Sequence, residues 1–229
     1  MTCQPTSMNS VINLRDALEL SLKAGLGEAL LTEISLHDWI QFDKDFVTLA
    51  HRHQEPPILA NGGRPWTTWL VLGGRGAGKT RLGAEWVRAA ASGTPPYSAQ
   101  PCLNIALVGE TEHDVREVMI EGPAGILRVS PRYERPYWTP TRRRLEWPNG
   151  AVGLAFSAED PEQLRGPQFD AAWCDELAKW RHADATFDML QFGLRLGVRP
   201  RQLITTTPRP IALIKRLLAD PRTAVTRAR

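Results

Sequence analysis

The stretch WLVLGGRGAGKTRLGAEWV, from Trp69 to Val87, determines how the rest of the chain is interpreted. It begins with a short apolar run, passes through a glycine-rich turn and ends in a helical pattern with Leu82 and Trp86 on one face. The turn matches the phosphate-loop pattern G-x-x-x-x-G-K-[ST] from Gly73 to Thr80. A strand before the loop and a helix after it are the context in which this pattern binds phosphate. The sequence therefore predicts a nucleotide-binding loop.

Each residue type in the loop has a chemical reason. Glycines let the backbone adopt positive φ and bring its N–H groups close to phosphate oxygens. Lys79 is expected against the β- and γ-phosphates, and the Thr80 hydroxyl is expected to bind Mg²⁺. The predicted ATP-binding residues are Gly73, Gly74, Arg75, Gly76, Ala77, Gly78, Lys79 and Thr80.

A second chemical stretch is FDAAWCDELAKW, residues 169–180. An apolar strand, 171–174, ends in the acidic pair Asp175 and Glu176. In a Walker B motif the strand-terminal aspartate holds Mg²⁺, and an adjacent glutamate takes a proton from the attacking water. Such a pair is a weak signal by itself, but it becomes a strong one downstream of a phosphate loop. The adjacent glutamate favours ATP hydrolysis coupled to motion.

Composition limits the class of protein. The chain has 229 residues, of which 42% are hydrophobic and 23% charged, as in a globular protein with one sizeable domain. No apolar run approaches a membrane span, and the N-terminus lacks the pattern of a signal peptide. Cys3, Cys102 and Cys174 stand in no metal-ligand spacing and suit a reducing cytoplasm.

Charge divides the chain in two. Residues 1–60 carry a net charge of −4 and residues 61–229 a net charge of +7, most of it from arginine. An arginine-rich segment permits a nucleic-acid partner without requiring one. Arg142, Arg143 and Arg144, beside several aromatic residues, form one candidate for gripping a nucleic-acid backbone, with a solvated face as the alternative.

The N-terminal residues 1–55 are predicted to be a small helical appendage. One helix has an apolar face formed by Val11, Leu14, Leu18 and Leu22 and ends at Gly25 or Gly27, and a second begins near Ser35. A connector rich in Pro and Gly then leads into the main domain, residues 56–229. Gln54 and Trp66, upstream of the phosphate loop, are candidate adenine contacts, with loop and core packing as the alternative.

The remaining elements follow from hydrophobic pattern. Residues 103–109 and 202–207 are predicted strands, 110–120, 182–196 and 210–220 are predicted helices, and 131–158 is predicted to hold antiparallel strands. Asn149-Gly150 is a hairpin turn signal. Thr205, Thr206 and Thr207 end their strand with hydroxyls that could sense the γ-phosphate. The last residues are predicted to be a basic tail.

The motifs GGRGAGKT, SAEDPEQLRGPQFDAAWCDELAKW and TTTPRP, in this order, resemble the large terminase subunit of tailed phages and gene-transfer agents, the ATPase of their DNA-packaging motor. The resemblance runs from about Gln54 to Arg229. It implies an α/β fold, a RecA-like P-loop NTPase with a mostly parallel sheet flanked by helices, with the helical appendage before it.

The resemblance also implies roles for individual residues. Arg75 becomes the candidate arginine finger in cis, Asp175 the Mg²⁺ ligand and Glu176 the residue that activates water. Thr205 to Thr207 become a coupling motif that links the nucleotide state to DNA movement. Arg165 is a further candidate for facing the nucleotide or a neighbouring subunit.

ATP and Mg²⁺ are the implied cofactors. The implied partners are double-stranded DNA, a portal protein, a small terminase subunit and further copies of the chain in a ring, in the cytoplasm of a bacterial host and without a membrane. Family members usually continue into a nuclease domain that this chain does not contain, so we expect no DNA cleavage by it. A helicase-like P-loop NTPase and a truncated, non-catalytic remnant that binds ATP or partners are the alternatives.

Overall fold

The computed structural model describes residues 19–33 and 45–228. The chain divides into two compact units, Met1–Glu55 and Pro56–Arg229, which we describe separately. In the first unit the beginnings of both expected helices lie outside the described residues. Residues 19–23 are helical, and the turn closes at Gly25, where φ is +74°. An unexpected helix, α2 (Gly27–Glu33), follows, and the described part of the second expected helix is only the single turn α4 (Phe46–Leu49).

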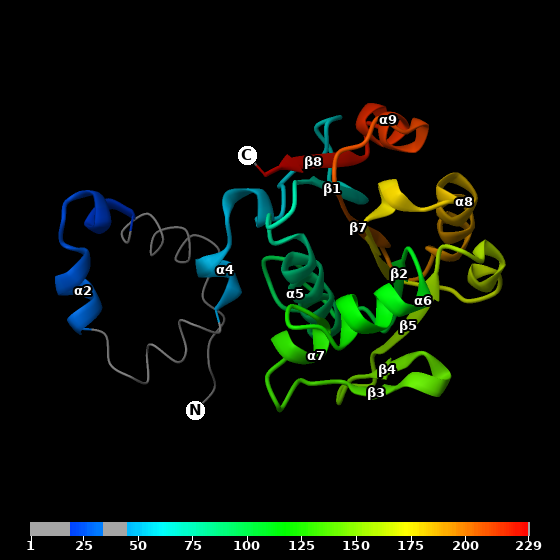
Figure 1. The fold of residues 1–229 in the computed structure, drawn as a ribbon, viewed down its shortest axis with the longest axis horizontal. Coiled ribbons are helices and arrows are strands. Elements are labelled where there is room, and N and C mark those ends of the chain that lie inside the picture. Colours follow the sequence, from blue (N-terminus) through cyan, green and yellow to red (C-terminus); the bar gives the residue numbers. More distant parts are fainter. Residues whose placement is uncertain (1–18, 34–44, 229) are drawn as a thin grey trace. The chain divides into compact units, whose positions relative to one another are not determined.

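An eight-stranded sheet forms the centre of the second unit, with the strand order β3-β4-β5-β2-β6-β7-β1-β8 (Figure 1). All neighbours from β5 to β8 are parallel, whereas β4 pairs antiparallel with both β3 and β5. The strands are β1 (Thr68–Leu72), β2 (Asn104–Gly109), β3 (Tyr137–Thr139), β4 (Arg144–Glu146), β5 (Val152–Ser157), β6 (Ala171–Asp175), β7 (Arg201–Thr206) and β8 (Thr223–Arg227). The expected α/β fold with a mostly parallel sheet is confirmed.

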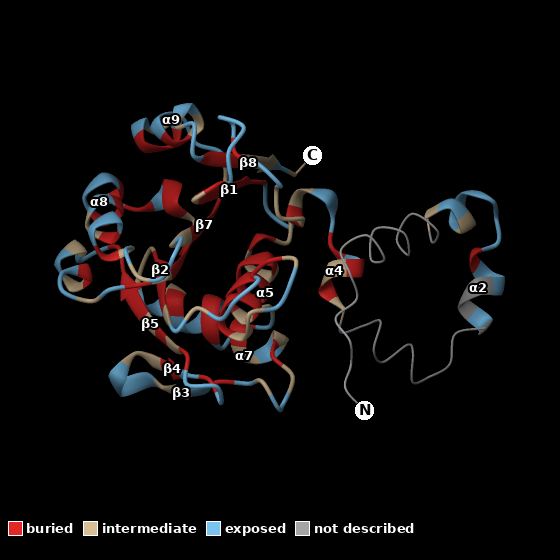
Figure 2. Cartoon of the chain, turned by 180° about the vertical axis from the view of Figure 1, so that it is seen from behind, coloured by how far each residue is buried: buried red, intermediate tan, exposed pale blue. Residues whose placement is uncertain are grey.

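The central strands are buried because helices cover both faces of the sheet (Figure 2). On one face, Leu70, Ile204 and their neighbours pack against α8 (Ala183–Gly193) and α9 (Ala212–Ala219). On the other face lies α5 (Lys79–Ser92), which packs on β6 and β7. The short helices of this unit are α6 (Glu112–Asp114), η2 (Val115–Ile120), α7 (Ile126–Val129), η3 (Pro140–Arg142), η4 (Pro161–Leu164) and η5 (Leu177–Lys179). Another short helix, η1 (Arg52–Gln54), belongs to the first unit.

The hairpin predicted at Asn149-Gly150 is confirmed. The N–H of Trp147 donates to the carbonyl of Ala151 at 2.9 Å, and Gly150 has a φ of +87°. The Asn149 Oδ1 atom accepts from the N–H of Ala151 at 3.1 Å, which closes the turn locally. Because β5 also pairs with β2, the hairpin extends the main sheet and does not form a separate one.

The prediction of a basic tail is wrong. Residues Thr223–Arg227 form β8, which pairs in parallel with β1 along its whole length. Thr223 and Ala224 are buried, and the N–H of Ala228 donates to the carbonyl of Leu72 at 2.9 Å. The segment TAVTR is short and shows no alternation of polar and apolar residues, so its pattern did not stand out, but it forms the edge strand of the sheet beside β1, which precedes the phosphate loop.

Gly83 allows a close approach between α5 and the sheet. A Cβ atom at this position would lie 1.9 Å from a ring atom of Trp173, which is fully buried on β6. Only a residue without a side chain therefore lets the indole ring lie against the helix backbone. The contact joins the helix that begins at the phosphate loop to the strand that ends at Asp175.

We predict that Gly83→Ala destabilises the protein, although glycine-to-alanine changes within helices usually stabilise by about 1 kcal/mol. The added methyl group must displace a buried tryptophan, and overpacking of this kind costs on the order of 1–3 kcal/mol or more. Chemical denaturation measures the change in the free energy of unfolding. In a Trp173→Leu background the same Gly83→Ala change should be neutral or stabilising, and an equal loss in both backgrounds would contradict the steric explanation.

Candidate nucleotide site at the carboxyl edge of the sheet

The sheet order brings the predicted motifs together. Strands β6, β7 and β1 are consecutive neighbours and parallel, so their carboxyl ends lie side by side. The phosphate loop follows β1, Asp175 ends β6 with Glu176 directly after it, and Thr206 ends β7 with Thr207 directly after it. Ligands of open α/β sheets bind at this edge. The register pairs Asp175 directly with Thr205, and Leu72 with Thr206.

The phosphate loop has the backbone that its glycines permit. Gly76 and Gly78 have φ values of +76° and +69°, a region that residues with a side chain rarely adopt. The N–H of Gly73 donates to the carbonyl of Thr206 at 3.1 Å, which fixes the start of the loop to β7. Helix α5 is 14 residues long and begins directly after the loop, so its positive end faces the place where an anion would bind. Arg75 is exposed within the loop.

Lys79 is buried behind the loop, with 8% of its surface exposed. Its Nζ atom donates to the carbonyl oxygens of Gly73 and Gly74, each at 2.9 Å. The same atom lies 3.3 Å from the Oε1 atom of Glu176. The Lys79 ammonium group therefore connects the loop to the acidic pair. The two carbonyls and the carboxylate compensate for the water that this group loses on burial.

Asp175 is also buried, with 7% of its surface exposed. Burial raises the pKa of its carboxyl group to about 6, although the hydrogen bond from Thr205 opposes this shift. The Thr205 hydroxyl lies 2.6 Å from the Oδ1 atom, and the indole N–H of Trp180 donates to the Asp175 carbonyl at 2.9 Å. Side chain and backbone of this residue are thus both held by hydrogen bonds.

Glu176 has a left-handed backbone, with a φ of +49°, which is costly for a residue with a side chain. Its carboxylate accepts from the Thr207 hydroxyl at 3.1 Å and from the Thr207 N–H at 3.3 Å, and Lys179 lies 3.6 Å away. Burial by itself would raise the pKa of Glu176, but Lys79, Lys179 and the Thr207 N–H lower it below its ordinary value. The carboxylate is therefore ionised and close to the loop.

All three threonines of the predicted coupling motif contact the acidic strand or the turn after it. Thr205 bonds Asp175, Thr207 bonds Glu176, and the Thr206 hydroxyl accepts from the N–H of Ala178 at 3.0 Å. Any displacement of the acidic pair would therefore be transmitted to β7. A role of these contacts in coupling stays a prediction.

The donor set at this edge fits Mg²⁺. The Asp175 Oδ2 atom makes no hydrogen bond among the residues that the structure describes, and the Thr80 side chain is half-buried at the start of α5. Within the described ranges no three His, Cys, Asp or Glu residues form a metal-binding group. Mg²⁺ bound with a nucleotide needs only one or two protein oxygens, because phosphates and water supply the other ligands.

The adenine candidate Trp66 lies at the amino end of β1, whereas the phosphate loop follows its carboxyl end. Trp66 precedes β1, so a strand of roughly 15 Å separates it from the loop. The Trp66 indole N–H donates to the Pro57 carbonyl at 2.7 Å, and Arg201 lies over the ring with its Cζ atom 5.2 Å from the ring centroid. These contacts favour the packing role that was the alternative, and the adenine role of Trp66 stays a prediction. Gln54 is buried in the first unit, and its role at the nucleotide stays a prediction.

The other arginine candidates lie on the surface. Arg165 is 76% exposed and pairs with Glu162 at 3.2 Å. In the hairpin, Arg143 pairs with Glu112 at 2.8 Å and Arg144 with Glu146 at 2.6 Å, so much of their charge is locally neutralised. These ion pairs favour the solvated-face interpretation over a nucleic-acid grip.

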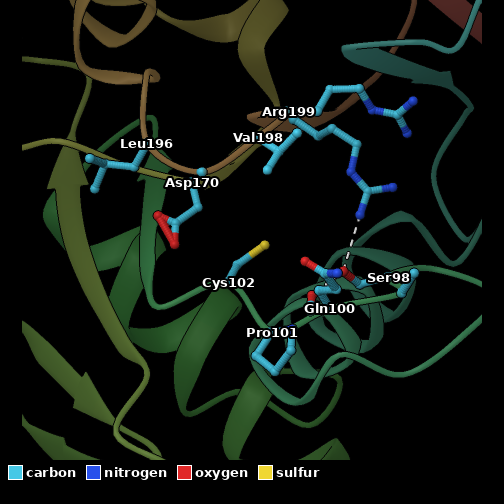
Figure 3. A pocket seen from close by; sticks show the side chains of 11 residues that line it. Ser98, Gln100, Pro101, Cys102, Asp170, Leu196, Val198 and Arg199 are labelled. Atoms are coloured by element: carbon cyan, nitrogen blue, oxygen red, sulfur yellow. Dashed lines mark hydrogen bonds between the residues drawn. The ribbon is translucent and has the colours of Figure 1, made fainter.

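A cavity of about 230 Å³ lies at the opposite edge of the sheet (Figure 3). It is lined by residues at the amino ends of β2, β6 and β7, among them Cys102, Asp170 and Arg201. The Cys102 sulfur points into it (Figure 3), and the Asp170 Oδ2 atom accepts from the N–H groups of Leu103 and Asn104. None of the predicted phosphate or Mg²⁺ ligands lines this cavity, so it is separate from the nucleotide site.

Sequence reasoning missed several residues that support the site. Trp173 and Trp180 donate indole hydrogen bonds around Asp175, and Lys179 faces Glu176. The tryptophans were visible on both sides of the acidic pair, but nothing in their spacing indicated their hydrogen-bond partners. Gly83 had a weak signal, since a glycine inside a helical pattern often marks a close approach.

Fold and site together define a RecA-like P-loop NTPase. A family model for the T4-like-virus type of terminase large subunit, N-terminal part, matches residues 70–224. The chain therefore belongs to this family of large terminase subunits. A search of curated proteins found no match.

Solved structures with the same fold include three large terminases of phages. The ATPase domain from Thermus phage P74-26 is 15% identical, with a TM-score of 0.55 and coverage of 77% of this chain and 80% of that chain. The large terminase of another thermophilic bacteriophage, in complex with ADP, is 15% identical, with a TM-score of 0.55 and coverage of 71% and 40%. The terminase of bacteriophage HK97 is 18% identical, with a TM-score of 0.50 and coverage of 81% and 38%.

We predict that Glu176→Gln destabilises the nucleotide-free protein at neutral pH, because it removes the negative charge beside buried Lys79. The expected loss is about 2 kcal/mol of unfolding free energy, below that of a fully buried pair because the Glu176 side chain is 21% exposed. Denaturant titration measures it. Glu162→Gln, in an exposed pair, is the control and should change stability by less than about 0.5 kcal/mol. Equal effects of the two changes would show that Glu176 does not stabilise Lys79.

Proposed function

We propose that this chain is the ATP-hydrolysing motor part of a phage-type terminase, and that it drives packaging of double-stranded DNA into a capsid. The supporting observation is that one buried ammonium group, Lys79, connects the phosphate loop to Glu176, beside the carboxylate of Asp175. Binding requires the loop and Lys79, whereas hydrolysis also requires a carboxylate that can take a proton from water.

In the proposed cycle, nucleotide phosphates replace the internal partners of Lys79. The loop N–H groups and the positive end of α5 bind the phosphate oxygens, and Lys79 turns from the Gly73 and Gly74 carbonyls to the β- and γ-phosphates. Glu176 then loses its contact with Lys79 and becomes free to orient the attacking water and accept its proton. The nucleotide thus releases the group that later acts as the general base.

Mg²⁺ would be held by Thr80 and by the Oδ2 atom of Asp175, directly or through water. When bound, it neutralises charge that develops on the β- and γ-phosphate oxygens. Asp175 is suited to this role because the Thr205 hydroxyl occupies its other oxygen and leaves the remaining one for a cation.

Arg75 is proposed to stabilise the charge of the transition state from within the loop. It is exposed and lies between glycines, so its guanidinium group can reach a bound γ-phosphate without displacing packed side chains. A guanidinium group offers several N–H donors in a planar fork, which suits phosphoryl oxygens.

Motion is proposed to pass from Glu176 to β7 through Thr207. The Glu176 carboxylate accepts from both the N–H and the hydroxyl of Thr207, so a change at the carboxylate alters the end of the strand.

The proposed partners are double-stranded DNA, a portal protein, a small terminase subunit and further copies in a ring in the bacterial cytoplasm. Within the described residues no helix is long and apolar enough to cross a membrane.

We predict that Lys79→Ala and Glu176→Gln both abolish ATP turnover but differ in binding. Lys79→Ala removes a phosphate ligand, so affinity for ATP should fall. Glu176→Gln should retain binding and lower turnover by roughly 10²–10⁴-fold, the contribution of a general base. Phosphate release measures turnover, and a fluorescent ATP analogue measures binding. Glu162→Gln is the control and should match the parent. Robust turnover by Glu176→Gln would remove that residue from the mechanism.

We predict that Arg75→Ala lowers turnover by roughly 10²-fold or more while ATP binding changes little, because the interaction forms mainly in the transition state. Arg132→Ala, at another exposed arginine, should leave turnover unchanged. An Arg75→Ala protein that turns over ATP at the parent rate would exclude a charge-stabilising role. Separation of the strands of a forked duplex by the parent protein would favour a helicase over a packaging motor.

A further inference from the structure

Trp173 begins a hydrogen-bonded chain that passes through Thr205 and ends at Asp175. Its side chain is fully buried on β6. The indole Nε1 atom is 2.8 Å from the Thr205 hydroxyl, which in turn is 2.6 Å from the Asp175 Oδ1 atom. Thr205 belongs to the neighbouring strand β7, so the chain crosses from β6 to β7 and back.

The direction of these hydrogen bonds is fixed by chemistry. An indole N–H can only donate, so the Thr205 oxygen must accept from Trp173. The single hydroxyl proton of Thr205 is then left for Asp175 at 2.6 Å or for the Cys174 carbonyl at 3.3 Å. The shorter bond to a carboxylate is the stronger one. Trp173 therefore sets the hydroxyl so that its proton points at the Oδ1 atom.

The consequence for Asp175 is a fixed orientation. Its Oδ1 atom is occupied, so the carboxylate presents its Oδ2 atom as the oxygen available to a cation. The indole ring cannot easily move, since Gly83 of α5 lies against it so closely that a Cβ atom would stand 1.9 Å away. Because α5 begins with Lys79 and Thr80, the ring relates both halves of the nucleotide site.

We propose that Trp173 is a positioning residue for the Mg²⁺-binding carboxylate, acting through the Thr205 hydroxyl. The inference rests on the proposed function and adds a group that does not touch the nucleotide. Partners that orient a metal ligand commonly change metal affinity by 10–100-fold when removed. Loss of the indole N–H should therefore weaken the use of Mg²⁺ much more than the binding of ATP itself.

Trp86 provides a matched control. It is 1% exposed on α5, and its indole N–H is buried without a hydrogen-bond partner among the described residues. Trp173→Phe and Trp86→Phe thus remove the same atoms from two similarly buried positions, but only the first breaks a hydrogen bond. Any effect of Trp173→Phe beyond that of Trp86→Phe reports on the contact with Thr205.

The experiment measures the Mg²⁺ concentration that gives half-maximal ATP turnover, together with Mn²⁺ affinity in the presence of ADP by calorimetry. Trp173→Phe should raise the half-maximal Mg²⁺ concentration and weaken Mn²⁺ binding by about tenfold or more, with metal-free ADP affinity within about twofold of the parent. Trp86→Phe should leave all three values within about twofold. Equal values for the two variants would overturn the proposal.

Thr205 variants test the same chain from its other member and remain informative if Trp173→Phe does not fold. Thr205→Ser keeps the hydroxyl and should retain the Mn²⁺ affinity of the parent, whereas Thr205→Val should weaken Mn²⁺ binding as Trp173→Phe does. The double variant with Trp173→Phe and Thr205→Val should bind Mn²⁺ no more weakly than Thr205→Val alone, because both substitutions break the same hydrogen bond between Trp173 and Thr205. Additive losses would overturn the proposal. If the parent hydrolyses no ATP, the proposed function fails, while the Mn²⁺ measurement still decides the role of Trp173.

Discussion

The structure of the nucleotide edge depends on the burial of one ammonium group, that of Lys79. Removing such a charge from water costs several kcal/mol unless other groups replace the hydration. Here the replacements are the carbonyls of Gly73 and Gly74 and the carboxylate of Glu176. To supply them, the loop must turn its carbonyls inward, which the positive φ of Gly76 and Gly78 allows, and Glu176 must adopt a left-handed backbone. The geometry of the loop and that of the acidic turn are thus two consequences of one requirement.

The same requirement explains why phosphate oxygens can replace the internal partners of Lys79. Carbonyl oxygens and a carboxylate compensate for a buried lysine, but phosphate oxygens carry more charge and lie where the helix dipole already favours an anion. Glu176 is held meanwhile by Lys179 and Thr207, so its carboxylate keeps two partners when Lys79 leaves. In the proposed mechanism, binding at the loop and release of the base are therefore one event, and Thr207 passes that event to β7.

The local parts of this account could be predicted from the sequence, and the long-range parts could not. An apolar run before GGRGAGKT, the Asn149-Gly150 turn and the acidic pair after 171–174 each carry their signal within a few residues. Strand β8 was missed because the five residues TAVTR lack a strand pattern of their own and are ordered as a strand by pairing with β1. The contacts of Trp66 with Pro57 and Arg201 could not be predicted, because spacing along the chain does not indicate the partners of a side chain. The bonds of Trp173 needed the neighbouring strand, since an indole N–H has no preferred partner in sequence.

The most direct test of the account is a crystal structure of the protein with Mg²⁺ and a non-hydrolysable ATP analogue. It reports the partners of the Lys79 Nζ atom when phosphates are present. We predict that this atom has left the carbonyls of Gly73 and Gly74 for the β- and γ-phosphate oxygens, and that the Glu176 carboxylate has lost its contact with Lys79 and faces a water beside the γ-phosphate. A bound nucleotide with Lys79 still on both carbonyls and on Glu176 would contradict the exchange on which the mechanism depends.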